Sequence, residues 1–135
     1  MKLSRKRILL VTVVFIFLIS FTFSAVYLKS VADYKKTVAE TVIGEVDISG
    51  IPDGVYAGEY DVNFIYAKVE VTVQSGEMTG ITLLEHKQER GKAAETIVQD
   101  MIAEQKIDVD AVSGATNSST VIKKAVENAL RNAVY

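Results

Sequence analysis

Apolar residues are distributed unevenly along the chain, and the longest apolar stretch lies near the N-terminus. From Ile8 to Leu28 no residue is charged and most are hydrophobic. At about 1.5 Å per residue, an uninterrupted helix over this stretch spans the roughly 30 Å of a bilayer's hydrocarbon core. The pattern therefore predicts a transmembrane helix.

Basic residues immediately precede the apolar stretch, namely Lys2, Arg5, Lys6 and Arg7. By the positive-inside rule, residues 1–28 form a cytoplasmic basic tip and anchor, and the rest of the chain lies outside the cytoplasm. A cleaved signal peptide is the alternative, because Thr22-x-Ser24 resembles a small-residue cleavage site. We favour the uncleaved anchor because the apolar stretch exceeds the roughly 7–15 residues of a signal-peptide core.

Mixed polarity marks the segment that follows the anchor. Apolar positions such as Val31, Tyr34 and Val38 recur at roughly helical spacing with charges between them, which predicts a helix that continues the anchor as a stalk. Pro52 and its neighbouring glycines then break the pattern. We expect a stalk or linker at residues 29–50 and one small domain at residues 51–135.

Alternating positions after this break predict strands. Residues 55–62 alternate imperfectly, whereas Ala67, Val69, Val71 and Val73 alternate cleanly with polar residues, the pattern of a strand with one wet face. Ser75-Gly76-Glu77 is a hairpin-type connection to another strand at residues 78–84. We expect an antiparallel meander of about three strands.

Helical periodicity returns in two later segments, residues 88–105 and residues 121–134. Their apolar stripes predict helices packed on one face of the sheet, and small Ala125, Ala129 and Ala133 would permit close approach. The predicted fold class is α+β: a small antiparallel sheet with helices packed on one face, preceded by an N-terminal transmembrane helix.

Charge and composition narrow the classes of function. Four of the 15 Lys and Arg residues precede Ile8, whereas all 17 Asp and Glu residues follow Leu28, so the external part is acidic. Nucleic-acid binding needs clustered basic residues, and we do not expect it. There is no Cys and one His, His86, so neither a thiol nucleophile nor the usual zinc site is expected. We expect His86 to be a solvated surface residue.

The most informative short stretch reads Asp110-Ala-Val-Ser-Gly-Ala-Thr-Asn-Ser-Ser119 and opens onto the last predicted helix. Unpaired N–H groups and the positive dipole end of a helix N-terminus suit a phosphate, although Ser, Thr and Asn there are also ordinary caps. Asp108 and Asp110 lie just before the helix, where a carboxylate is usually a cap or turn residue. We therefore expect no catalytic acid–base pair and no metal site.

The run Asp-x-x-Ser-Gly-Ala-Thr-x-Ser-Ser resembles the flavinylation motif of the FMN-binding domain family. The resemblance extends over roughly residues 51–134, including Asp53-Gly54 and Gln105. In that family, which includes the covalent-flavin subunits of ion-pumping NADH:quinone and ferredoxin oxidoreductases, a flavin transferase moves the FMN moiety of FAD onto a threonine. The resemblance implies covalent FMN in a small membrane-anchored member.

The same resemblance implies roles for individual residues. Thr116 is the expected acceptor, with the hydroxyls of Ser118 and Ser119 as alternatives, and Asp110 is expected to be recognised by the transferase. Gly114 would permit the tight turn. The expected cofactor-binding residues are Ser113, Gly114, Ala115, Thr116, Asn117 and Ser118. Independently of the resemblance, Tyr56, Tyr60 and Tyr66 on the predicted sheet are candidates for stacking on the flavin ring, although strand tyrosines are more often packed or half-exposed aromatics.

The expected function is that of an extracytoplasmic, membrane-tethered electron carrier and not of a stand-alone enzyme. Its expected partners are the flavin transferase, a membrane electron donor and an acceptor beyond the membrane. One alternative is a flavin-dependent reductase of a small acceptor, which would need a second binding region. Another is a non-redox surface binding module.

Overall fold

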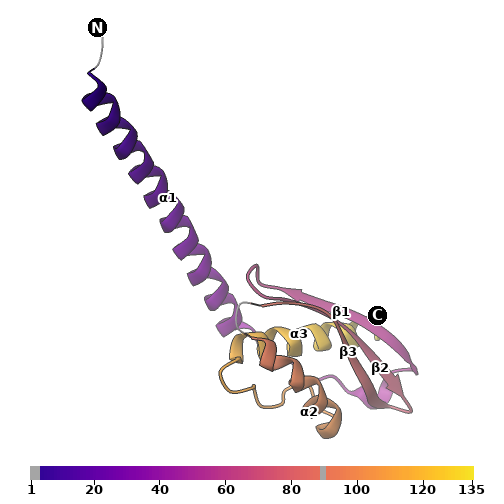
Figure 1. Cartoon of the computed structure of the whole chain (residues 1–135). Coiled ribbons are helices and arrows are strands. Elements are labelled where there is room, and N and C mark those ends of the chain that lie inside the picture. Colours follow the sequence, from indigo (N-terminus) through magenta and orange to yellow (C-terminus); the bar gives the residue numbers. More distant parts are fainter. Residues whose placement is uncertain (1–3, 89–90) are drawn as a thin grey trace. The chain divides into compact units, whose positions relative to one another are not determined.

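The computed structural model describes residues 4–88 and 91–135 (Figure 1). Packing divides the chain into two units, one that ends at Asp33 and one that spans Tyr34–Tyr135. The first unit contains most of a long helix. The second contains the end of that helix, the sheet and the remaining helices.

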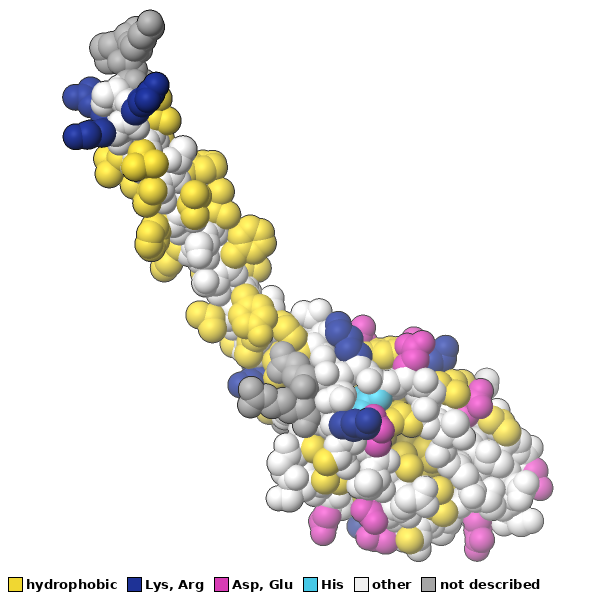
Figure 2. Space-filling view, in the orientation of Figure 1, with side chains coloured by type: hydrophobic (Ala, Val, Ile, Leu, Met, Phe, Trp, Pro, Cys, Tyr) yellow, Lys and Arg dark blue, Asp and Glu magenta, His cyan; other side chains and the backbone are white. Residues whose placement is uncertain are grey.

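Helix α1 (Arg5–Glu40) contains the apolar stretch and is long and apolar enough to cross a membrane. Its large side chains are exposed, with Phe17 at 73% and Phe23 at 74%. Figure 2 shows these apolar side chains along the helix and the basic side chains near its N-terminal end. The hydroxyls of Thr12 and Thr22 each donate to a carbonyl in the preceding turn at 2.8 Å, so they are satisfied without water. These features are consistent with a single-pass anchor.

The segment expected as a stalk, residues 29–50, divides between the two units. Helix α1 runs through its first half, as expected for a helix that continues the anchor. Tyr34 and Val38 are buried, however, and the Gly44 N–H donates to the Glu127 carboxylate at 3.0 Å. The later part of the segment therefore packs as part of the domain, which differs from a free stalk.

The second unit is built on three antiparallel strands in the order β1-β2-β3, and this arrangement confirms the predicted meander. The central strand alternates as expected, because its inner side chains are fully buried while the alternate positions are partly exposed. The buried inner residues are Ala67, Val69, Val71 and Val73. The strands are β1 (Gly54–Asp61), β2 (Tyr66–Gln74) and β3 (Glu77–Lys87), and a short 3₁₀ helix, η1 (Ile48–Gly50), precedes them.

A two-residue turn joins β2 to β3. Gln74 pairs with Glu77, and the intervening Ser75 and Gly76 have φ angles of 53° and 77°. Two positive φ angles in a two-residue loop are the requirement of a type I′ turn, whose twist matches that of the flanking strands. The Ser75 N–H also donates to the Asp53 carboxylate at 2.7 Å, which ties the turn to the start of β1.

Helix α3 (Thr116–Asn132) packs on β1 and β2 (Figure 1). A Cβ atom built at Gly58 of β1 would lie 2.2 Å from the Ala129 nitrogen and 2.4 Å from the Ala125 oxygen. A side chain at position 58 would therefore push α3 away from the sheet. The close approach that Ala125 and Ala129 predicted is confirmed.

The predicted helix over residues 88–105 begins later than expected. Gln88 is not helical, and its side-chain oxygen accepts a hydrogen bond from the Gly91 N–H at 2.6 Å. The predicted helical residues 89–90 lie outside the described residues. The observed helices here are the 3₁₀ helix η2 (Lys92–Thr96) and α2 (Ile97–Glu104).

Gln105 fixes α2 against the sheet. It ends the helix in a left-handed conformation with φ 51°, and its side-chain amide pairs with both the N–H and the carbonyl of Met78, at 2.7 Å each. Helices α2 and α3 thus cover the same face of the sheet, against β3 and against β1 and β2 respectively. The α+β fold class with an N-terminal apolar helix is confirmed.

Candidate functional site

The hydroxyl-rich stretch forms the first turn of α3 and the loop before it. The helix begins at Thr116, earlier than the expected Val121. Hydroxyl side chains do not interrupt it, because they donate to carbonyls one turn back: Thr120 to the Thr116 oxygen at 3.1 Å and Ser119 to the Ala115 oxygen at 2.8 Å. The first three helical residues are therefore Thr116, Asn117 and Ser118.

The N-cap position of α3 is held by Ala115, which has no side-chain oxygen. The capping role that Ser, Thr and Asn often have at a helix start is therefore not observed, since no side-chain cap hydrogen bond is present at this helix end. The first-turn N–H groups lack a side-chain cap, and the helix dipole adds positive potential there. This arrangement suits an anion such as a phosphate.

The three candidate hydroxyls differ sharply in exposure. Thr116 is exposed, whereas Ser118 is 2% exposed and Ser119 is fully buried. The Ser119 oxygen is also engaged, because it accepts from the Val112 N–H at 3.0 Å. Of these three hydroxyls, that of Thr116 is therefore the one accessible to another macromolecule.

Gly114 forms the turn that leads into α3. Its φ angle of 78° lies in the left-handed region, where a Cβ atom would be strained. No other atom lies within 4 Å of where that Cβ would be, so the space around Gly114 is open. Glycine is therefore required here by the backbone conformation and not by a steric contact. The Ala115 N–H closes the turn by donating to the Val112 carbonyl at 2.9 Å.

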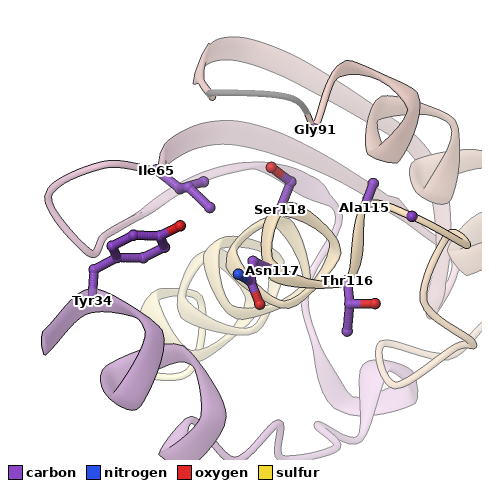
Figure 3. Close-up of a pocket in the computed structure, with 8 residues that line it drawn as sticks. Tyr34, Ile65, Gly91, Ala115, Thr116, Asn117 and Ser118 are labelled. Atoms are coloured by element: carbon purple, nitrogen blue, oxygen red, sulfur yellow. The ribbon is translucent and has the colours of Figure 1, made fainter. Parts of the chain in front are cut away.

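A cavity of about 330 Å³ lies beside this turn (Figure 3). Its volume is at the lower end of the roughly 300–1,000 Å³ typical of small-molecule sites. Ser113 and Asp110 do not border it. The structure brings most of the predicted cofactor-binding residues together here with three others: Gly114, Ala115, Thr116, Asn117 and Ser118 are joined by Tyr34, Ile65 and Gly91.

The three tyrosines expected as stacking candidates do not border this cavity. The Tyr56 hydroxyl donates to the Pro52 carbonyl at 2.7 Å, and the Tyr60 hydroxyl lies 2.9 Å from the Thr41 hydroxyl. The Tyr66 hydroxyl donates to Glu59 at 2.7 Å, and this hydrogen bond is the main reason that the pKa of Tyr66 rises to about 12.

Tyr34 is the aromatic residue that borders the cavity. The sequence prediction missed it because its apolar spacing with Val31 and Val38 indicated only a stalk helix. The helical spacing of Tyr34 and Val38 among charged residues was the one sequence signal for an apolar face on this helix.

The loop before the motif is anchored by charged side chains, of which Lys123 is buried. The Glu45 carboxylate accepts from the N–H groups of Ile107 and Asp108, at 3.2 and 2.8 Å. The largely buried Lys123 amine then donates to the Asp108 carboxylate at 2.8 Å. Asp108 is exposed but is a structural anchor through these contacts, and Asp110 is exposed and accessible to a partner.

The prediction that His86 is a solvated surface residue is wrong. Its side chain is 2% exposed, and its Nδ1 atom lies 3.0 Å from the Glu95 carboxylate, which links β3 to η2. Its position near the end of a strand that is covered on one face explains the burial. Within residues 4–88 and 91–135, no cluster of three His, Cys, Asp or Glu side chains that could hold a metal ion was found.

Sheet, helices and a motif cavity together define a small ligand-binding α+β domain. Residues 66–131 match the family described as FMN-binding domain, and the chain belongs to this family. The domain therefore has a flavin-binding role with FMN as its cofactor. Comparison with curated proteins gave no match, and comparison with solved structures gave none either.

Proposed function

We propose that this chain is a membrane-tethered, extracytoplasmic electron carrier with FMN attached to Thr116 by a phosphoester. The position of Thr116 carries the proposal. Thr116 is exposed, begins the first turn of α3, borders the cavity and lies within the matched domain. Burial disfavours the hydroxyls of Ser118 and Ser119 as acceptors.

Attachment would be a group transfer from FAD. The Thr116 oxygen forms a bond to the phosphorus of the FMN half, the bond from that phosphorus to the bridging pyrophosphate oxygen breaks, and AMP leaves. The hydroxyl proton passes to a base of the transferase, and a metal ion held by that enzyme stabilises the departing AMP. No electrons are exchanged in this step, so the chain needs to present only an accessible hydroxyl.

The residues around Thr116 would position the group. Gly114 leaves room on the surface for the transferase, and the exposed Asp110 gives that enzyme an acidic contact. The uncapped end of α3 would hold the phosphate through its backbone N–H groups. When bound, FMN supplies the redox chemistry, while the chain tethers and orients it.

A carrier fits the cavity better than the alternative of a reductase of a small acceptor. The cavity is small for a site that must hold both a flavin ring and a second substrate. In a carrier, electrons need only pass through the exposed edge of the bound ring to a donor or acceptor protein. The non-redox surface module is the remaining alternative, and it predicts no bound flavin.

Helix α1 and its basic flank support the proposed location. With the N-terminus in the cytoplasm, the domain would lie beyond the membrane, between a membrane donor and an external acceptor. Protease added to intact cells should then digest the C-terminal domain. Protection of the domain in intact cells, with digestion after lysis, would contradict this topology.

Expression with and without a flavin transferase tests the function itself. The protein made with the transferase should remain yellow and fluorescent after denaturation, because a covalent link survives unfolding. The protein made without the transferase should lose any flavin on denaturation. Colourless protein from both cultures would favour the surface module.

A further inference from the structure

One wall of the cavity comes from outside the matched region. Tyr34 lies on α1, well before residue 66, where the family match begins. It is the aromatic residue among the described residues that border the cavity, and only 7% of it remains exposed. Figure 3 shows Tyr34 and Thr116 on either side of Asn117 and Ser118 among the residues that line the cavity.

Neighbouring apolar residues hold the Tyr34 ring in place. The ring of Phe64 packs on it, with centroids 4.9 Å apart and planes tilted by 41°. Ile65, which is 5% exposed, borders the cavity beside it. Phe64 and Ile65 belong to the turn between β1 and β2, so the sheet itself orients the tyrosine.

The end of α1 is also fastened to the domain after Tyr34. The hydroxyls of Thr41 and Tyr60 are 2.9 Å apart, and the Lys124 amine donates to the Val42 carbonyl at 3.0 Å. These contacts join the segment after α1 to β1 and to α3. Tyr34 therefore has a defined position relative to the motif.

We propose that Tyr34 is a positioning residue for the flavin, with the isoalloxazine ring packed against its phenol ring. The inference rests on the proposed function for the identity of the ligand. A group joined to Thr116 through its phosphate extends its ring away from Thr116, and Tyr34 lines the same cavity. Flat aromatic systems gain from offset or tilted packing, and a ring already held by Phe64 loses little freedom when a second ring packs on it.

The first measurement is a titration of the full-length Thr116→Val chain in detergent micelles with free FMN. Tyr34→Leu in that background keeps an apolar side chain and removes the ring, so FMN binding should weaken roughly two- to tenfold. Tyr34→Phe should bind FMN within about twofold of the parent, because the ring remains. Tyr56→Leu is the matched control, since the Tyr56 hydroxyl bonds to the Pro52 carbonyl and Tyr56 does not border the cavity, and it should bind FMN like the parent.

The second measurement is the fluorescence of covalently loaded chains that retain Thr116. Phenol and indole rings in contact with an excited flavin donate an electron to it and quench its emission, whereas a phenyl ring does not. Emission should therefore rise severalfold in Tyr34→Phe and stay quenched in Tyr34→Trp. Both variants keep an aromatic ring at position 34. This comparison therefore tests the contact between residue 34 and the flavin even if circular dichroism shows that Tyr34→Leu does not fold.

The outcomes separate this inference from the proposed function. Equal FMN affinity in folded Tyr34→Leu, or equal emission in Tyr34→Phe and the parent, overturns the role of Tyr34 while covalent loading can still stand. Tyr34-dependent binding of free FMN by a chain that the transferase never loads supports the inference and contradicts the covalent proposal. A chain that neither binds FMN nor is loaded overturns both.

Discussion

The Ser119 hydroxyl accepts a hydrogen bond from the Val112 N–H at 3.0 Å and donates one to the Ala115 carbonyl at 2.8 Å. One fully buried side chain thus joins the loop before the turn to the first turn of α3. Because Gly114 and Thr116 lie inside this connection, Ser119 sets the geometry in which the proposed acceptor hydroxyl of Thr116 is presented. Ser119, which the sequence suggested as an alternative acceptor, is therefore a structural residue of the site.

Replacing Ser119 should therefore weaken both the domain and the site. Ser119→Ala removes both hydrogen bonds of this hydroxyl and leaves the partly buried Val112 N–H without that partner, which should lower the free energy of unfolding by about 1–3 kcal/mol. Flavin loading should fall as well, because the turn is no longer held. Urea denaturation and the fluorescence of the loaded protein measure the two effects.

Thr120→Ala is the control for this change. The Thr120 hydroxyl donates to the Thr116 carbonyl and has no tie to the preceding loop among its described contacts. Its loss should cost about 1 kcal/mol or less and leave loading intact. Equal losses of stability and loading in the two variants would show that the Ser119 connection has no special role.

Gly114 should matter more for flavin loading than for folding. In Gly114→Ala the left-handed φ of 78° becomes strained by about 1–2 kcal/mol, which favours a different turn without disturbing the core. Loading by the transferase should drop several-fold while circular dichroism stays unchanged. Gly50→Ala, at another glycine with open space around it, should change neither property. Parallel loss of folding and loading in Gly114→Ala would make the glycine purely structural.

Glu127 should stabilise the domain only above mildly acidic pH. Burial alone would raise its pKa, but hydrogen bonds from Lys124, the Gly44 N–H and Arg131 outweigh that effect and hold the pKa below its ordinary 4.5. A carboxyl with a lowered folded-state pKa stabilises the fold above its unfolded-state pKa, and this stabilisation is lost as the pH falls through the folded-state value.

The free energy of unfolding should therefore be higher for the parent than for Glu127→Gln, by a constant amount above about pH 5.5. The difference should shrink as the pH falls below about 4.5, because a protonated carboxyl resembles the amide. Urea denaturation across this range measures it. A difference that is unchanged down to about pH 3 would mean that the charge of Glu127 contributes nothing.

Removal of residues 1–28 should release a soluble domain. The remaining chain keeps Tyr34 and Val38, whose burial belongs to the domain, and lacks the exposed apolar stretch. It should sediment as a soluble species and still accept flavin. A deletion beyond Val38 is the informative comparison, and it should unfold or aggregate because it removes both buried side chains. Membrane partitioning of the shorter deletion would contradict a single anchor.

The sequence predicted the elements whose patterns are local. The alternation from Ala67 to Val73 is a property of a half-buried strand, and Ser75-Gly76 meets the backbone requirement of one turn type, so both were recognisable. The motif likewise indicated a helix N-terminus. Its exact start at Thr116 was missed because hydroxyl residues are typical of caps, and here they bond back to the helix instead.

Features that depend on packing between distant segments were not predictable in the same way. Tyr34 reaches the motif only because Phe64 and the segment after α1 hold it there. The buried His86 side chain pairs with Glu95 in η2, nine positions away in a segment expected to be a regular helix. The periodicity of apolar residues along the sequence does not indicate these contacts between distant segments. The contact of Tyr34 with Phe64 completes one wall of the cavity beside the motif.

The intact mass of Thr116→Val, made beside the parent with the same flavin transferase, tests the central claim most directly. The substitution keeps the branched shape, removes only an exposed hydroxyl and should cost about 1 kcal/mol of stability or less. The parent should gain the mass of one FMN moiety, and peptide mapping should place it on residues 116–119. Folded Thr116→Val should gain none, whereas a variant that still carries the FMN mass would contradict Thr116 as the acceptor.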